Sequence, residues 1–207
     1  MNRVLSSVPH DMAQSARDLE RELRLPEGFL ESLEEEDDWS FIIKLHALLE
    51  GAISFLLTRH FGGNEALAKI MDRIELSNKE TGKMAFVKAL DLLIPEGQTF
   101  ISKLSELRNK VVHNISEVGF DLSLYVQCLN KDQFNNFVQA FQLGDISKRG
   151  KNLQEQKERV GVNAKHRMLE CAVMILAIVH VTQAATVATR QLSQAAVDLA
   201  RARSTEQ

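Results

Sequence analysis

The stretch "WSFIIKLHALLEGAISFLLTRHF", residues 39–61, decides the fold class. Its apolar residues recur at spacings of three and four, so on an α-helix they gather on one wide face. These residues are Phe41, Ile42, Leu45, Leu48, Leu49, Ala52, Ile53 and Leu56. Gly62 and Gly63 follow, and glycines are typical of a helix end. The stretch therefore predicts a long core helix of an all-α protein.

The rest of the chain favours the same class. Its 207 residues include only three prolines and ten glycines, and most segments lack the alternation that strands require. We expect an N-terminal helical arm with an acidic turn, 1–37, and a helical-bundle domain, 38–207, with a long C-terminal helix. Within them the pattern predicts helices in 1–26 (stopped by Pro26), 64–75, 79–93, 97–113, 131–144 and 164–200.

Three segments have a less regular pattern. Residues 27–38 carry seven acidic side chains and no basic one, which predicts a solvated turn whose Asp37 or Asp38 caps the next helix. Residues 114–129 are expected to be irregular or to hold short extended pieces. Residues 145–167 hold seven lysines and arginines against three acidic residues. This basic segment is expected to be a mobile loop, with a rim that attracts phosphate as the alternative.

Charge and cysteine usage narrow the function. A net charge of −3 argues against a protein that coats nucleic acid by bulk electrostatics. Cys128 and Cys171 form no disulfide framework, and we expect a cytoplasmic protein. Residues 168–189 contain no lysine or arginine and could span a bilayer, but Glu170 and its polar neighbours favour a core or dimer helix without membrane contact. No phosphate-binding loop, dinucleotide fingerprint or zinc spacing occurs, so we expect no metal and no cofactor.

One further stretch, "LSELRNKVVHN" at residues 104–114, is unusual. On a helical wheel Arg108 falls within the apolar stripe, whereas Asn109 and His113 share the polar face. A desolvated guanidinium is costly unless it is paired. One interpretation is a structural salt bridge from Arg108 to Glu50 or Asp91, with His113 favoured by the helix dipole.

The pattern of Arg108, four residues and His113 resembles the R-x(4–6)-H motif of the HEPN superfamily. The resemblance implies an all-α bundle with a long early helix, matching 39–61, and a later helix that ends in the motif, matching 97–113. Many HEPN domains are metal-independent endoribonucleases of toxin–antitoxin or abortive-infection systems. In them the motif arginine and histidine of two protomers line one cleft.

The chemistry of such a site follows from the residue types. A histidine such as His113 exchanges protons near neutral pH, and Arg108 would grip a phosphate through its fork of donors. Asn109 would orient His113 or a phosphate oxygen, and Lys110, Lys148, Arg149 and Lys151 would attract RNA. Because one chain supplies one motif histidine, and because Arg108 and His113 point ~140° apart on a helix, we expect a homodimer with RNA as substrate.

Two alternatives stay open. The layout also resembles that of mannitol-operon-repressor-type helical regulators, which implies a non-catalytic protein that binds a protein partner through its long terminal helix. A cognate antitoxin or regulatory protein is a possible partner in either case. His46 and Glu50, four residues apart, resemble half of an acid–base pair, but without further ligands they are interpreted as structural.

Overall fold

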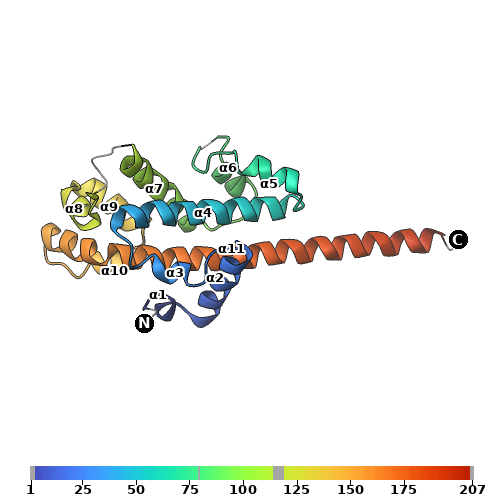
Figure 1. The fold of residues 1–207 in the computed structure, drawn as a ribbon, viewed down its shortest axis with the longest axis horizontal. Coiled ribbons are helices and arrows are strands. Elements are labelled where there is room, and N and C mark those ends of the chain that lie inside the picture. Colours follow the sequence, from blue (N-terminus) through green and yellow to red (C-terminus); the bar gives the residue numbers. More distant parts are fainter. Residues whose placement is uncertain (1–2, 79, 114–118, 206–207) are drawn as a thin grey trace.

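The structure is a computed structural model that describes residues 3–78, 80–113 and 119–205, and in these ranges it is helical with no strand. The expected all-α class is confirmed, including the long C-terminal helix (Figure 1). The helices are α1 (Arg3–Ser7), α2 (His10–Glu22), α3 (Phe29–Ser32), α4 (Asp38–His60), α5 (Glu65–Met71), α6 (Lys83–Ala89), α7 (Pro95–Val112), α8 (Leu122–Cys128), α9 (Lys131–Ala140), α10 (Gly144–Ser147) and α11 (Leu153–Thr205).

Helix α4 is the core helix expected from residues 39–61. The Asp37 carboxylate caps its first turn by accepting a 3.0 Å hydrogen bond from the Ser40 amide. At the other end the chain turns through Gly62 and Gly63, whose φ angles of +119° and +75° suit glycine. The predicted apolar face of α4 is buried, packing against α11 as well as α5, α6 and α7.

Helix α11 supports the remainder of the fold. It runs 53 residues, about 80 Å at 1.5 Å per residue, and contacts α1, α2, α4, α8, α9 and α10. In Figure 1 the smaller helices surround its first half, and its second half projects from the bundle. Helices α4 and α11 are both long and apolar enough to cross a membrane by length and composition alone. In α4, 61% of the most apolar 18-residue stretch is buried inside the bundle, as expected of a core helix.

Most of the basic segment is helix rather than loop, which corrects the expectation for 145–167; residues 148–152 form the turn between α10 and α11. The Asn152 side chain caps α11 by accepting from the Glu155 amide, and Val160 and Ala164 are fully buried. Lys157 is only 9% exposed because its Nζ donates to the Gln127 carbonyl of α8. Long basic side chains bury their alkyl stems in this way, so a run of lysines does not exclude a packed helix.

The acidic turn lies against this basic helix instead of facing solvent alone. His166 Nδ1 lies 2.7 Å from Glu34 Oε1, and Lys165 Nζ lies 3.4 Å from Asp38 Oδ1. The two oppositely charged segments therefore neutralise each other in part. Three cations of the basic segment stay exposed at the turn from α10 to α11; we call Lys148, Arg149 and Lys151 the turn cations.

Residues 119–129 also differ from the expectation of irregular or extended chain; residues 114–118 lie outside the described ranges. Helix α8 forms because Asp121 accepts from the Leu124 amide, and because Leu122 and Val126 are buried. The first turn of α8 has a further hydrogen bond, in which the Leu122 amide donates to the Asp38 carboxylate at the start of α4. A seven-residue helix is too short to show a clear apolar periodicity in the sequence. Here the cap and the packing of its buried residues stabilise the helix instead.

Candidate functional site

The motif lies in the last two turns of α7. Buried side chains, among them Leu104, Leu107 and Val111, fix this helix on the core, and Arg108 is half-buried at the edge of that face. His113 follows the last helical residue and is exposed, and its amide donates to the Asn109 carbonyl at 3.1 Å. The helix continues unbroken through Val112, so Arg108 and His113 of one chain lie on different faces.

A buried polar cluster joins α7 to α4 beside the motif. His46 is 7% exposed, and its Nε2 lies 3.1 Å from the Oγ of Ser105, which is 2% exposed. The Ser105 hydroxyl donates its proton to the Ile101 carbonyl, so its oxygen accepts from His46. His46 must therefore carry its proton on Nε2 when neutral.

The electrostatics of the cluster keep His46 neutral. Burial lowers the pKa of His46; the Glu50 carboxylate opposes this effect, and the positive charges of Arg108 and Lys83 add to it. Arg108 is thus near enough to His46 to act on its charge. These effects favour the neutral imidazole over the imidazolium.

Glu50, expected as a partner of Arg108, is held by another cation. Lys83 at the start of α6 is 1% exposed, and its Nζ lies 2.9 Å from Glu50 Oε1. Glu50 Oε2 lies 3.9 Å from His46 Nδ1. Asp91, the other expected partner, precedes α7, and thirteen residues of helix separate Pro95 from Arg108, about 20 Å.

Arg108 consequently has no carboxylate within ion-pair distance in the described part of the chain. Its Nη1 donates to Asn109 Oδ1 at 3.0 Å, a contact with a neutral group that does not compensate the charge of the guanidinium. Asn109 thus contacts Arg108, and its expected role toward His113 or a phosphate oxygen stays a prediction. A half-buried arginine with no carboxylate among the described residues is chemically suited to an anion.

The expected RNA-binding lysines and arginines lie apart. Lys110, one residue beyond Asn109, places its ammonium 4.3 Å from the centre of the Tyr125 ring on α8. The turn from α10 to α11, which carries the turn cations, is at the lower left of Figure 1, whereas α7 ends at its upper edge. Lys110 lies within the motif, between Arg108 and His113, and the turn cations form a separate positive surface.

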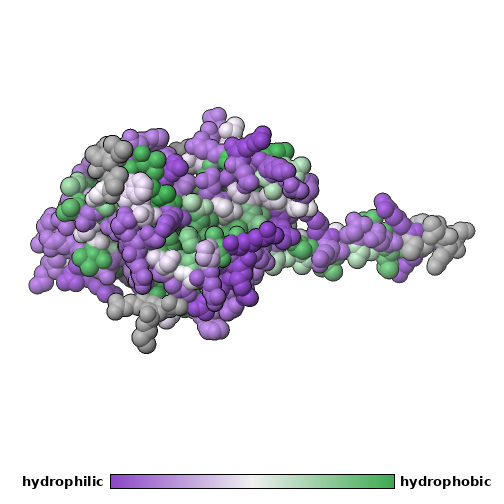
Figure 2. All heavy atoms as spheres, viewed as in Figure 1, coloured by the Kyte–Doolittle hydropathy of each residue, from purple (hydrophilic) through white to green (hydrophobic). Residues whose placement is uncertain are grey.

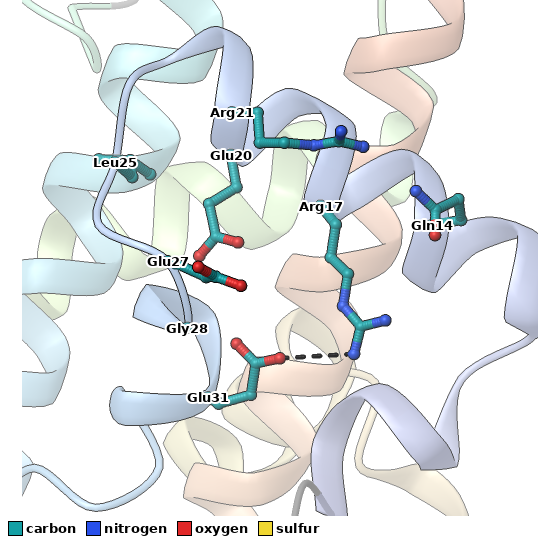
Figure 3. A pocket seen from close by; sticks show the side chains of 8 residues that line it. All are labelled: Gln14, Arg17, Glu20, Arg21, Leu25, Glu27, Gly28 and Glu31. Carbon is teal, nitrogen blue, oxygen red and sulfur yellow. Dashed lines mark ion pairs between the residues drawn. The ribbon is translucent and has the colours of Figure 1, made fainter.

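A hollow of about 620 Å³ lies between α2 and α3 (Figure 3). In Figure 3 the Arg17 side chain points toward Glu31, 3.5 Å away, and Glu20 points into the space. Glu20 accepts from the Leu30 amide at 3.0 Å, and burial raises the pKa of its carboxyl. These contacts join α3 to α2, so the charges of this hollow have a structural role.

Lys83 is the residue of the cluster that the sequence did not suggest. It comes from a different helix and has no recognisable spacing to the motif, so only the folded chain brings it to Glu50.

Among the described residues, no group of three or more His, Cys, Asp and Glu is placed to hold a metal ion. No family model, curated protein or solved structure matches this chain.

Proposed function

We propose that this helical protein is a HEPN-like, metal-independent endoribonuclease of the toxin or abortive-infection type. Arg108 and His113 of two copies would share one cleft. The observation that carries the proposal is the state of Arg108: it is half-buried at a helix end, has no carboxylate within ion-pair distance among the described residues, and Glu50 is bound to Lys83 instead. A phosphate of RNA would supply the missing negative charge.

The reaction that suits these groups is internal attack by the ribose 2′-oxygen. One His113 takes the 2′-hydroxyl proton as the 2′-oxygen bonds to phosphorus, and the bond from phosphorus to the 5′-oxygen breaks. The other His113 gives its proton to that leaving oxygen, which leaves a 2′,3′-cyclic phosphate and a 5′-hydroxyl. Arg108 stabilises the extra negative charge of the phosphorane. Two histidines are needed, hence two copies of the chain.

The second candidate function is a non-catalytic helical regulator of the mannitol-repressor type. It is favoured by the exposed apolar residues of the projecting half of α11, a surface suited to a protein partner. In that case Arg108 would have a structural role or bind an anion without cleaving it.

The test compares Arg108→Ala and His113→Ala with matched controls, Arg159→Ala and His10→Ala, whose side chains are exposed elsewhere. Cleavage of single-stranded RNA is measured in EDTA, and thermal stability is measured on the same samples. We expect each motif variant to lose cleavage by at least about 100-fold with its melting temperature near the parent's, and both controls to stay active.

The opposite pattern would reject the nuclease. A parent without EDTA-resistant cleavage, combined with a strongly destabilised Arg108→Ala, would mean that Arg108 holds the fold. A parent that cleaves RNA equally well after both motif substitutions would place the activity elsewhere.

A further inference from the structure

The second half of α11 leaves the bundle with an uncovered apolar surface. Its contact with α4 is made by Arg190, whose guanidinium donates to the carbonyls of Arg59 (3.1 Å) and His60. Beyond Arg190 the helix continues for fifteen residues, about 22 Å. Figure 2 shows hydrophobic side chains between polar ones along this projecting part. A helix of this length is marginal in water unless something packs on it.

Six of the exposed apolar residues form one continuous stripe, which we call the seam. They recur at intervals of four, three, four, three and four, the heptad spacing of a coiled coil. Val181, Leu192 and Leu199 are 58%, 74% and 60% exposed. The seam comprises Val181, Ala185, Ala188, Leu192, Ala195 and Leu199.

The seam faces away from the bundle. Arg190, which contacts α4, lies on the opposite side of the helix, two residues before Leu192 and five after Ala185. A partner helix can therefore lie along the seam without displacing α4. The alanines of the seam also let two backbones approach closely.

The charges beside the seam select the partner and its direction. With Leu192 and Leu199 at heptad position a, Asp198 occupies position g and Arg203 position e. In a parallel pair, position g faces position e five residues later in the partner, so Asp198 of each copy meets Arg203 of the other. In an antiparallel pair g faces g and e faces e, so Asp198 would face Ala184, Gln191 or Asp198 of the partner and never Arg203. The sequence is thus complementary to itself in the parallel direction.

We propose that the seam binds a second copy of this chain, forming a parallel two-stranded coiled coil along residues 181–203. This inference needs neither Arg108 nor His113, so it can fail while the nuclease proposal stands, and the reverse. Parallel pairing places both bundles at the same end of the coil. It thereby raises the effective concentration of one α7 end near the other.

Cysteine cross-linking of the full chain tests the seam and its direction. In a Cys128→Ser background, whose remaining Cys171 is buried, Ala188→Cys and Ala195→Cys are each oxidised and compared with Val197→Cys. Val197 is exposed on the opposite side of the same helix. In a parallel coil both seam cysteines face their own copies at about 6 Å, so both should give disulfide dimers about tenfold faster than the control.

Equal cross-linking at all three positions would overturn the proposal. Efficient cross-linking at one seam position alone would overturn the parallel direction, because an antiparallel pair brings identical residues together only near its two-fold axis.

Sedimentation of charge variants gives a second, independent measure. Asp198→Arg and Arg203→Asp should each weaken the dimer by about tenfold, and the double exchange should restore it. Leu192→Asp should weaken it by about 100-fold, because a charge would be desolvated in the seam. A parent that stays monomeric at 100 micromolar, or that floats with phosphatidylcholine vesicles through the seam, would show that no second copy covers it.

Discussion

Replacing Lys83 with methionine tests the buried ion pair at the centre of the polar cluster. The Lys83 side chain is 2% exposed and that of Glu50 is 33% exposed, with 2.9 Å between Nζ and Oε1. Breaking a fully buried pair costs about 3–5 kcal/mol, and partial hydration of the remaining Glu50 lowers this to about 2 kcal/mol. Unfolding entropy is about 2.1 cal/mol/K per residue, so the 207-residue chain should melt about 5 °C lower.

Removing the other partner of this ion pair, Glu50, should lower the free energy of unfolding by more. Glu50→Met leaves the Lys83 ammonium without its carboxylate in a nearly dry site, so we expect a loss of about 3–4 kcal/mol. The double variant should be more stable than Glu50→Met alone, since it removes both charges. Lys69→Met is the matched control, because the Lys69–Glu65 pair is exposed on both sides and should contribute less than about 0.5 kcal/mol.

Chemical denaturation monitored by circular dichroism measures the free energy of unfolding of the four variants and of the parent. If Lys83→Met and Lys69→Met change the free energy of unfolding equally, the ion pair is not buried as described. A double variant as unstable as the sum of the two single variants would show that Lys83 and Glu50 do not interact.

Three further outcomes follow from the geometry. The pKa of His46 lies below that of an unfolded histidine, so the folded state loses stability as pH falls below about 6.5, and His46→Gln should remove that part of the pH dependence in denaturation curves. Gly51→Ala should raise the melting temperature, because open space surrounds the added methyl group, whereas Gly161→Ala should lower it by about 2–6 °C through a clash 2.6 Å from a serine hydroxyl oxygen of α8. Replacing the three turn cations with glutamate should weaken RNA binding and lower the slope of log affinity against log salt concentration by up to about three. An unchanged slope would mean that the turn cations do not contact RNA.

Much of the fold was predictable because the apolar periodicity and the caps of its main helices can be recognised within each segment of the sequence. The apolar face of residues 39–61 and the Asp37 cap together place α4 to within about two residues. Residues 97–113 likewise become α7, which starts two residues earlier, at Pro95. In both helices local preference and tertiary burial agree, so the sequence is sufficient.

The errors arose where contacts between distant segments decide the structure. From the sequence alone Lys157 is expected to be a solvated charge. In the structure it is buried, and its Nζ donates to a carbonyl of α8. The candidate site divides in the same way. Arg108 and His113 could be selected from one helix, but the pairing of Lys83 with Glu50, which engages the carboxylate expected to pair with Arg108, depends on a contact between residues 33 positions apart. No periodicity within a single helix encodes such a contact.

The place of α11 in the chain has a consequence for biosynthesis. Helices α1, α2, α4, α8, α9 and α10 all rest on α11, yet a ribosome makes every one of them before it. The apolar faces of α2 and α4 therefore emerge without the helix that covers them, and the bundle can close only after α11 has followed. Non-local closure of this kind is slow and leaves hydrophobic surface open to aggregation. Synthesis of this protein should accordingly depend on chaperones that shield the nascent chain.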